Sequence, residues 1–255
     1  MHLRLLGFII AGLIGGSILA STGIIGPILI PALLPMGLPS GVARGTTLVS
    51  ELLMTLSCVL GHRKERNVDK LVILALLPGA ATVVLGAKVS VQFPELHMKL
   101  AIGILEMIIG VTVVFRTRKM QGKEGPEATV RTKADVPKFV IAAILAGAAK
   151  GFFGMGWGPI VVGSLVLLGV KSQIAVGSSL VVRLLLDSLG GITYLSMNLV
   201  DFEATIALAV AGALIAPPTV KWTKGRKEET LRTFVGGMIT IVGAIVIAKE
   251  LLSLY

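Results

Sequence analysis

The sequence consists largely of apolar runs of about 15 to 25 residues that are separated by short polar segments. A helix that crosses the hydrocarbon core of a bilayer needs about 20 predominantly apolar residues. Only 15% of the 255 residues are charged and the mean hydropathy is +0.90, whereas about 25% of an average soluble domain is charged. The pattern therefore predicts an all-α polytopic membrane protein and excludes a water-soluble globular domain.

The positive charge of the chain lies mainly in its loops. The formal net charge is +10, but 16 of the 24 Lys and Arg residues lie in the segments 62–70, 116–138 and 221–232. Basic residues beside membrane spans stay on the cytoplasmic side, so we expect cytoplasmic loops and no nucleic-acid partner. One cysteine and three histidines supply too few ligands for a metal cluster or a redox pair, so no cofactor and no metal are expected.

The two halves of the chain resemble each other. Residues 26–55 align with residues 158–187 without gaps and share 12 identities in 30 positions, several of them Gly and Pro. Chance similarity between apolar helices seldom aligns Gly and Pro, so the alignment indicates an internal duplication. The first apolar run also fits a cleavable signal peptide. Cleavage would remove a segment that has a counterpart in the second half, so we expect the run to be retained.

Each half contains about five apolar segments. They lie at approximately 5–21, 24–38, 40–61, 71–92 and 97–115 in the first half, and 138–154, 157–170, 173–197, 203–220 and 230–253 in the second. The expected organisation is a first transmembrane repeat at 1–115, a basic cytoplasmic linker at 116–138 and a second transmembrane repeat at 139–255.

Basic and non-basic loops exchange places between the two halves. The loop 62–70 is basic, whereas its counterpart at 198–203 has no Lys or Arg; conversely, 221–232 is basic and 89–98 is not. With an odd number of segments per half, the two copies then lie antiparallel in the cell membrane, with both termini outside. This is the inverted-repeat plan of secondary transporters.

The second segment of each half is short and follows a glycine-rich turn, at Ser21-Thr22-Gly23 and at residues 154–158. Segments 24–38 and 157–170 either span the membrane or are re-entrant and stop at mid-bilayer. A helix that begins inside the membrane directs free N–H groups into a cavity, and these groups suit an anion. The alternative is that the glycines only let helices pack closely.

Motifs in both halves carry a resemblance to a known family. In the first half they are Gly12 to Gly16, Ser21-Thr22-Gly23, Gly26-Pro27, Gly37, Ala43 and Gly45-Thr46-Thr47; in the second they are Gly147, Gly151, Gly154-Met155-Gly156-Trp157-Gly158-Pro159, Gly169 and Ala175-Val176-Gly177-Ser178-Ser179. With these motifs, essentially the whole chain resembles the TauE/SafE family of sulfite exporters, also called the sulfite/organosulfonate permease family. The resemblance implies a plasma-membrane carrier of sulfite, an organosulfonate or another small sulfur oxyanion.

Four charged residues lie near the centres of apolar segments: Glu51, Glu106, Arg183 and Asp187. A charge at mid-bilayer costs about 2.5 to 3.5 kcal/mol even on a permissive scale, so each is expected to face a partner or a cavity. Arg183 and Asp187 are spaced i, i+4 and can pair, and Glu51 occupies the repeat position of Arg183, so these two can also meet. Arg183 is therefore either a bidentate oxyanion ligand or part of a structural ion pair.

Two further ionisable groups have alternative interpretations. Glu106 has no cation within one helical turn; it is either a proton carrier, a role also open to Glu51, or a protonated carboxyl group that is hydrogen-bonded to a neighbouring helix. Lys150 is a second candidate cation, and the favoured interpretation is that it snorkels to the cytoplasmic interface.

The hydroxyl pairs Thr46-Thr47 and Ser178-Ser179 occupy equivalent repeat positions, so four hydroxyl groups can serve one central site, although Ser and Thr also bond to their own helix carbonyls. The candidate substrate-binding residues are Ser21, Thr22, Thr46, Thr47, Gly156, Trp157, Ser178, Ser179 and Arg183, with Glu51, Glu106 and Asp187 as coupling or charge partners.

The predicted function is export of sulfite or a related small sulfur oxyanion or organosulfonate by alternating access, with proton coupling left open. A passive anion channel and an importer of another small anion are the alternatives. No catalytic residues are expected, because the candidate site holds neither a nucleophile with a base nor metal ligands. The lipid bilayer and the anion are the expected partners, and the oligomeric state is left open.

Overall fold

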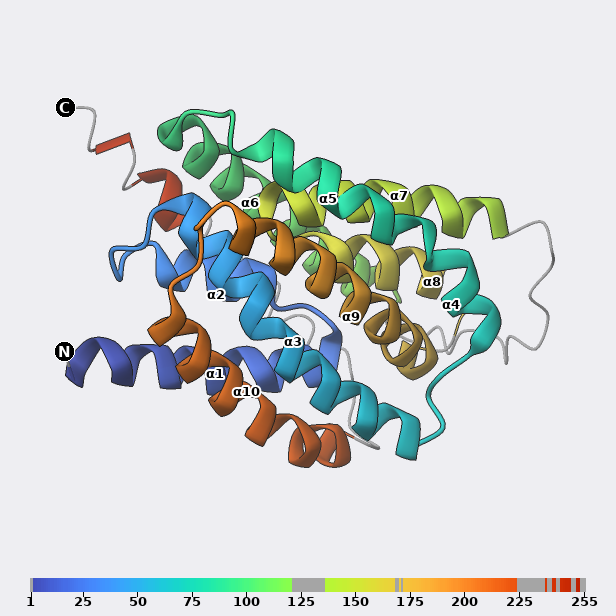
Figure 1. The fold of residues 1–255 in the computed structure, drawn as a ribbon. Helices are drawn as coiled ribbons and strands as arrows, with labels where there is room; N and C mark the ends of the chain where they lie inside the picture. Colours follow the sequence, from blue (N-terminus) through green and yellow to red (C-terminus); the bar gives the residue numbers. More distant parts are fainter. Residues whose placement is uncertain are drawn as a thin grey trace.

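The structure is a computed structural model that describes residues 2–120, 136–167, 170, 172–223, 237, 240–241, 244–248 and 251–252. Within these residues all regular secondary structure is helical (Figure 1). The elements are α1 (His2–Thr22), α2 (Gly26–Leu33), α3 (Ser40–Lys64), α4 (Lys70–Leu76), α5 (Pro78–Ser90), α6 (Glu95–Met120), α7 (Val136–Phe153), the π-helix η2 (Gly158–Val162), α8 (Gly163–Leu167), α9 (Ser172–Ser196) and α10 (Phe202–Thr223).

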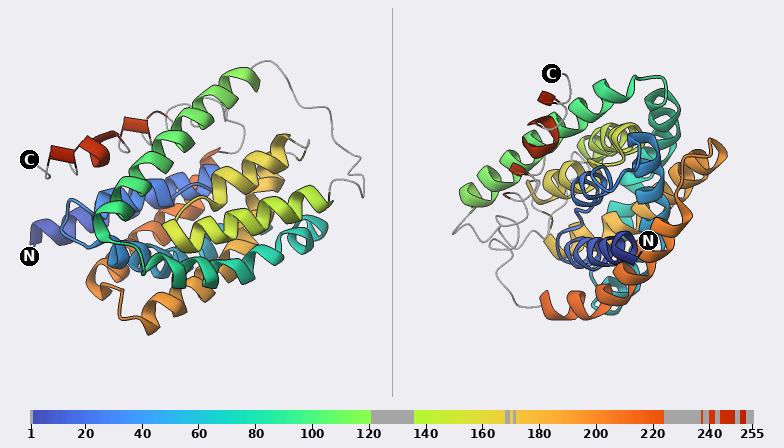
Figure 2. Two further views of the ribbon diagram at one scale, coloured as in Figure 1. Left: turned by 90° about the horizontal axis from the view of Figure 1, so that it is seen from above. Right: turned by 90° about the vertical axis from the view of Figure 1, so that its left-hand side faces the viewer.

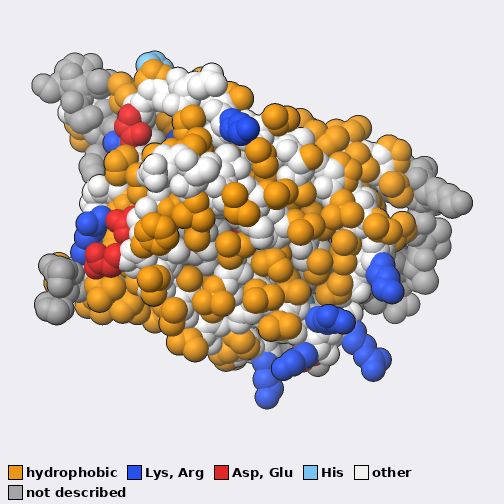
Figure 3. Space-filling model, in the orientation of Figure 1, with side chains coloured by type: hydrophobic (Ala, Val, Ile, Leu, Met, Phe, Trp, Pro, Cys, Tyr) orange, Lys and Arg blue, Asp and Glu red, His pale blue; other side chains and the backbone are white. Residues whose placement is uncertain are grey.

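Six helical segments among the described residues are long and apolar enough to cross a membrane. They are Leu3–Thr22, Ser40–Lys64, Lys70–Ser90, Val136–Phe153, Gln173–Ser196 and Phe202–Trp222. Apolar side chains cover most of the face shown in Figure 3, and most of the charged side chains lie toward its left end and its lower right, apart from one basic side chain near the upper middle. This distribution suits a protein whose middle section contacts lipid, and it confirms the expected multi-pass membrane protein.

Most of the expected segments correspond to helices of the bundle. Segment 71–92 is divided into α4 and α5 at Pro78, because a proline inside a helix removes a backbone hydrogen bond and clashes with the preceding turn. The expected segment 230–253 lies largely outside the described residues, and so do residues 121–135 of the expected linker.

The short segments after α1 and α7 do not form spanning helices. α2 has 8 residues and η2 and α8 have 5 each, so at 1.5 Å per residue α2 covers about 12 Å of a hydrocarbon core of about 30 Å. The chain reverses between α1 and α2 at Gly23, whose φ is +73°, a conformation that glycine adopts without steric cost. A Cβ atom at Gly7 would lie 3.0 Å from Met36 Cε, so the chain after α2 has returned to the level of the first turns of α1.

Glycines allow α1 to pack closely against α10 and α7 to pack closely against α5 (Figure 2). A Cβ atom at Gly16 would lie 2.5 Å from Gly212 Cα, and a Cβ atom at Gly151 would lie 2.8 Å from Ala87 N. At these two contacts, glycine therefore lets membrane helices pack closely, as small residues often do.

The central helices α3 and α9 each have 25 residues, and their bounds fall on matching positions of the sequence alignment. Gly45, near the start of α3, packs against Leu199, just after α9; Gly177, near the start of α9, packs against Asn67, just after α3. The two helices therefore lie side by side and run in opposite directions.

We predict that Gly45→Ala destabilises the protein, because the added Cβ would overlap Leu199 O and lie 2.9 Å from Tyr194 Cβ. Overpacking of this kind lowers the free energy of unfolding by about 1 to 3 kcal/mol, which thermal unfolding of the purified protein in detergent would measure. Gly41→Ala is the matched control one turn earlier, where the nearest atom is an ordinary 3.5 Å away. It should be neutral or stabilising, since Ala favours helix over Gly by about 1 kcal/mol, and equal stability of the two variants would contradict the packing.

Candidate functional site

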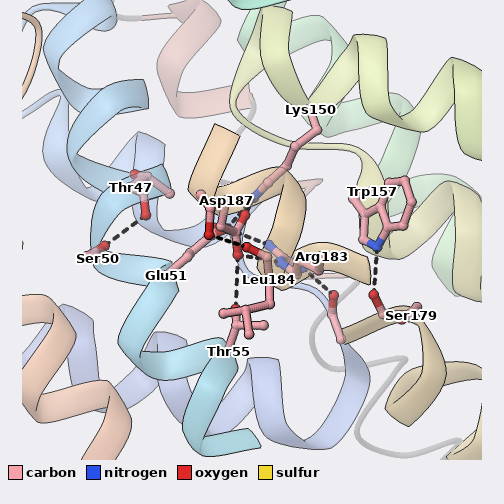
Figure 4. Close-up of polar contacts among 12 residues, drawn as sticks. Thr47, Ser50, Glu51, Thr55, Lys150, Trp157, Ser179, Arg183, Leu184 and Asp187 are labelled. Atoms are coloured by element: carbon pink, nitrogen blue, oxygen red, sulfur yellow. Dashed lines mark hydrogen bonds and ion pairs between the residues drawn. The ribbon is translucent and has the colours of Figure 1, made fainter. Parts of the chain in front are cut away.

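Four charged side chains meet in the interior of the bundle (Figure 4). Glu51 comes from α3, Lys150 from α7, and Arg183 and Asp187 come from α9. Arg183 is 2% exposed and the other three are completely buried. We call these four residues the central charge cluster.

Each acidic side chain of the central charge cluster contacts both basic side chains. Lys150 Nζ contacts Glu51 Oε2 and lies 3.1 Å from Asp187 Oδ1. Arg183 Nη2 lies 2.9 Å from Glu51 Oε2, and Arg183 Nε lies 3.6 Å from Asp187 Oδ2. Two formal positive charges are thus balanced by two formal negative charges, as burial of ions in a medium of low dielectric constant demands.

Two uncharged groups attach the central charge cluster to the surrounding helices. Thr55 Oγ1, on α3, donates a hydrogen bond of 3.0 Å to Asp187 Oδ2. Arg183 Nη1 donates a hydrogen bond of 2.8 Å to Gly23 O in the reversal that follows α1. The cluster therefore joins α3, α7, α9 and the first glycine turn at one point.

These contacts decide several expectations from the sequence. The predicted contacts of Arg183 with Asp187 and with Glu51 are confirmed. The interpretation of Lys150 as a snorkelling side chain is wrong, because α7 ends at Phe153 inside the bundle and its last turn therefore lies beside the two carboxylates. Glu106 belongs to α6, but its side chain lies outside the described residues, so its role stays a prediction.

Some polar atoms at the centre are buried without a hydrogen-bond partner among the described residues. They are Thr47 Oγ1, Glu51 Oε1, Arg183 Nε and Asp187 Oδ1, of which the last two still lie within ion-pair distance of an opposite charge. A buried polar group without a partner costs about 1 to 3 kcal/mol, so a ligand that bonds to these atoms would bind favourably. Thr47 and Arg183 offer donors to an anion, and the Glu51 oxygen can accept a proton.

The four predicted hydroxyl groups do not converge on one point in this arrangement. Thr46 Oγ1 accepts a hydrogen bond of 2.9 Å from Asp201 N, and Ser178 Oγ accepts one of 2.9 Å from Asp69 N. Ser179 Oγ donates to Val176 O in its own helix. Of these four hydroxyl groups, only that of Thr47 has no hydrogen-bond partner among the described residues.

The predicted residues of the glycine turns mainly stabilise the turns themselves. Ser21 Oγ and Thr22 Oγ1 donate to carbonyls of α1, and Thr22 Oγ1 also accepts from Ile24 N. Gly156 has a φ of +108°, which favours glycine. Trp157 is 1% exposed, and its Nε1 donates a hydrogen bond of 3.2 Å to Ser179 O, so the indole joins the second turn to α9.

The sequence analysis did not single out a further buried cation, Arg44. Its Nε donates to Ser40 O at 3.0 Å, its Nη1 donates to Phe152 O at 2.7 Å, and its guanidinium lies 5.8 Å from the ring centroid of Tyr194. One signal in the sequence could have identified Arg44: it precedes Glu51 by seven residues, and this spacing places both residues on one face of a helix. Among the described residues no group of three or more His, Cys, Asp or Glu side chains is placed to hold a metal ion.

We predict that Lys150→Met strongly destabilises the protein, because Glu51 and Asp187 would then share a single cation. Breaking a buried ion pair by removing one partner costs about 3 to 5 kcal/mol, which thermal unfolding in detergent would detect. The double variant Lys150→Met with Asp187→Asn restores the balance of charge and should recover much of the loss. The exposed Lys88, on α5, provides the control Lys88→Met, and equal stability of the two single variants would contradict the ion pairing.

Comparison with known proteins adds an independent line of evidence. The family described as "Sulfite exporter TauE/SafE" matches residues 8–246. The chain is 26% identical over 194 residues to the "Probable membrane transporter protein YdhB" of Bacillus subtilis (strain 168), a match that covers 74% of this chain and 78% of that protein. No solved structure matches the chain significantly. The helical membrane bundle and the family match agree: this chain is a membrane transporter, not an enzyme, and belongs to the TauE/SafE sulfite exporter family.

Proposed function

We propose that this transporter exports sulfite, or a related small sulfur oxyanion or organosulfonate, across the cell membrane. Membership of the family supports the class of substrate. The observation that carries the proposal is the guanidinium of Arg183, which is 2% exposed and whose Nε has no hydrogen-bond partner among the described residues. A planar guanidinium binds an oxyanion through two parallel N–H bonds.

The proposed mechanism is alternating access by two inverted repeats, residues 1–115 and 139–255, joined by the linker at 116–138. Reciprocal contacts support the repeat: Asp69 N binds Ser178 Oγ and Asp201 N binds Thr46 Oγ1. Exchange of each residue for its aligned counterpart converts the first of these hydrogen bonds into the second. Such a pair of contacts is what a two-fold pseudo-symmetry axis between antiparallel copies produces.

The backbone conformation after α3 and α9 supports the same proposal. Arg66 and Asn198 occupy aligned positions and have φ values of +58° and +56°, and no other described residue apart from glycine has a positive φ. Non-glycine residues rarely adopt this conformation, so its recurrence at aligned positions favours two copies of one folding unit.

Charge balance in the centre supports coupling to protons. The carboxylates of Glu51 and Asp187 already neutralise Lys150 and Arg183. An anion that enters the same buried volume brings a net negative charge, and an uncompensated buried charge is costly. A proton on Glu51, whose Oε1 has no partner among the described residues, would accompany the anion and preserve neutrality.

We predict that cysteines at two aligned positions react from opposite sides of the membrane. Lys64 and Ser196 are the last residues of α3 and α9, and both are exposed. The basic loop at 62–70 is proposed to be cytoplasmic and both termini external, so a membrane-impermeant maleimide added outside intact cells should label Ser196→Cys but not Lys64→Cys. After permeabilisation both should react.

The wild-type chain is the control for this labelling experiment, because its single cysteine, Cys58, is buried. Labelling of both variants from the same side would contradict the inverted arrangement of the two repeats.

We predict saturable sulfite flux in proteoliposomes of the purified protein, and loss of this flux in Arg183→Ala. The physical reason is that alanine removes the cation that would bind the oxyanion. Flux should be measured with sulfate as competitor and with or without an imposed pH gradient. A response to the gradient indicates a proton-coupled carrier, whereas saturable flux that ignores the gradient indicates a uniporter.

The matched control is Arg63→Ala, which removes an exposed arginine outside the central charge cluster. Normal flux in a folded Arg183→Ala variant would exclude Arg183 from the mechanism. Sulfite flux that does not saturate would favour a passive channel, and absent sulfite flux would direct the same assay to organosulfonates.

A further inference from the structure

One face of α3 carries buried polar or ionisable side chains from its second turn to its last. They recur at intervals of three or four residues and are Arg44, Thr47, Glu51, Thr55, Cys58 and His62, each at most 5% exposed. Eighteen residues of helix rise about 27 Å, close to the thickness of the hydrocarbon core of a bilayer. The row therefore provides polar groups across the whole depth of the membrane.

The two ends of this row carry different groups. At the end of α3 that contains Ser40, the Arg44 guanidinium binds Ser40 O and Phe152 O beside the ring of Tyr194. At the end that contains Lys64, His62 Nε2 lies 3.2 Å from Ala20 O. The aligned counterpart of Arg44 in α9 is Val176, so this buried guanidinium has no equivalent in the second half.

Arg44 also differs from Arg183 in its partners. Arg183 is paired with two carboxylates, whereas no carboxylate of the described residues lies within 4 Å of the Arg44 guanidinium nitrogens. Glu95 instead accepts hydrogen bonds from Ser40 N and Ser40 Oγ at 2.6 and 2.5 Å. Arg44 is 3% exposed, so it is a buried cation that is hydrogen-bonded to carbonyl groups beside a ring, with the Glu95 carboxylate beyond ion-pair distance but close enough to attract it.

We propose that Arg44 and Thr47 form a second anion-binding site, between the central charge cluster and the Ser40 end of the bundle. The inference rests on the proposed function, and the ligand is the same small oxyanion in transit. A guanidinium that binds neutral carbonyls gains from replacing one of them with an anion, because the opposite charges attract strongly in an interior of low dielectric constant and an oxyanion can accept two parallel N–H bonds. Thr47 lies one turn further along α3, and its buried hydroxyl has no partner among the described residues.

The position of this site suits a stepwise path. Arg44 precedes Glu51 by seven residues, which corresponds to about 10 Å along the helix axis. An anion that leaves Arg183 in the direction of the Ser40 end would therefore reach a second cation after about two helical turns. The aligned position in α9 is occupied by the uncharged Val176, so an anion that leaves Arg183 in the opposite direction meets no equivalent cation there. The two faces of the transporter should therefore differ in their apparent affinity for the anion.

The test compares Arg44→Gln and Thr47→Val with the wild type in proteoliposomes. Sulfite is presented separately to the Ser40 face, which is the side of the membrane toward which the Ser40 end of α3 points, and to the opposite side, the Lys64 face. Arg44→Gln should raise the half-saturating sulfite concentration at the Ser40 face by about tenfold to a hundredfold, the equivalent of one hydrogen bond to a charged group. The value at the Lys64 face should change much less. Arg44→Lys keeps the charge without the planar fork, so its half-saturating concentration at the Ser40 face should lie between those of the wild type and Arg44→Gln. Arg63→Gln is the control for loss of an exposed arginine.

Thr47→Val keeps the proposal testable if Arg44→Gln fails to fold. The substitution preserves the branched shape and removes a hydroxyl that has no partner, so the variant should be at least as stable as the wild type and should still bind sulfite more weakly at the Ser40 face. Half-saturation that is unchanged in a folded variant, or changed equally at both faces, would overturn the second site and leave Arg44 with a structural role. Absence of saturable flux of both sulfite and organosulfonates in the wild type would instead contradict the proposed function itself.

Discussion

The ion pairs of the central charge cluster determine how the parts of this bundle meet. Glu51, Lys150, Arg183 and Asp187 come from three helices, and Arg183 also binds Gly23 O after α1. Buried charges are tolerated only when they are paired and hydrogen-bonded. The crossing of α3 and α9, the end of α7 and the reversal after α1 therefore have to coincide, and movement of any one of them would leave a charge without its partner.

The glycines make this coincidence sterically possible. A Cβ atom at Gly26 would lie 2.8 Å from Met155 Cα, and a Cβ atom at Gly158 would lie 2.9 Å from Gly23 C. The two glycine turns therefore pack backbone against backbone, next to the residue whose carbonyl binds Arg183. Glycines have two structural roles here: Gly16 and Gly151 let helices pack closely, whereas Gly23 and Gly154 adopt positive φ in the two turns.

Properties that depend on periodicity and alignment could be predicted from the sequence. Most of the apolar segments correspond to helices of the described residues, and the alignment of Glu51 with Arg183 predicted a contact that the structure confirms. The depth of Lys150 could not be predicted, because it depends on where α7 ends inside the bundle. The hydrogen-bond partners of the Thr46 and Ser178 hydroxyls could not be predicted either, because they lie in loops that are distant in sequence. The burial of Arg44 could not be predicted, because in the sequence it resembles an ordinary basic residue near the end of a span.

The strengths of the polar contacts along α3 suggest how the protein could open at one end and remain closed at the other. The ends of the row depend on hydrogen bonds to carbonyls, from Arg44 to Phe152 and from Tyr194 to Gly151 at one end, and between His62 and Ala20 at the other. Such bonds contribute about 0.5 to 3 kcal/mol each to stability. Removal of one partner from a buried ion pair costs more, about 3 to 5 kcal/mol. We therefore expect either end to separate while the centre stays paired. The anion would then be the ligand that loosens the centre, since it competes with Glu51 and Asp187 for the same cations.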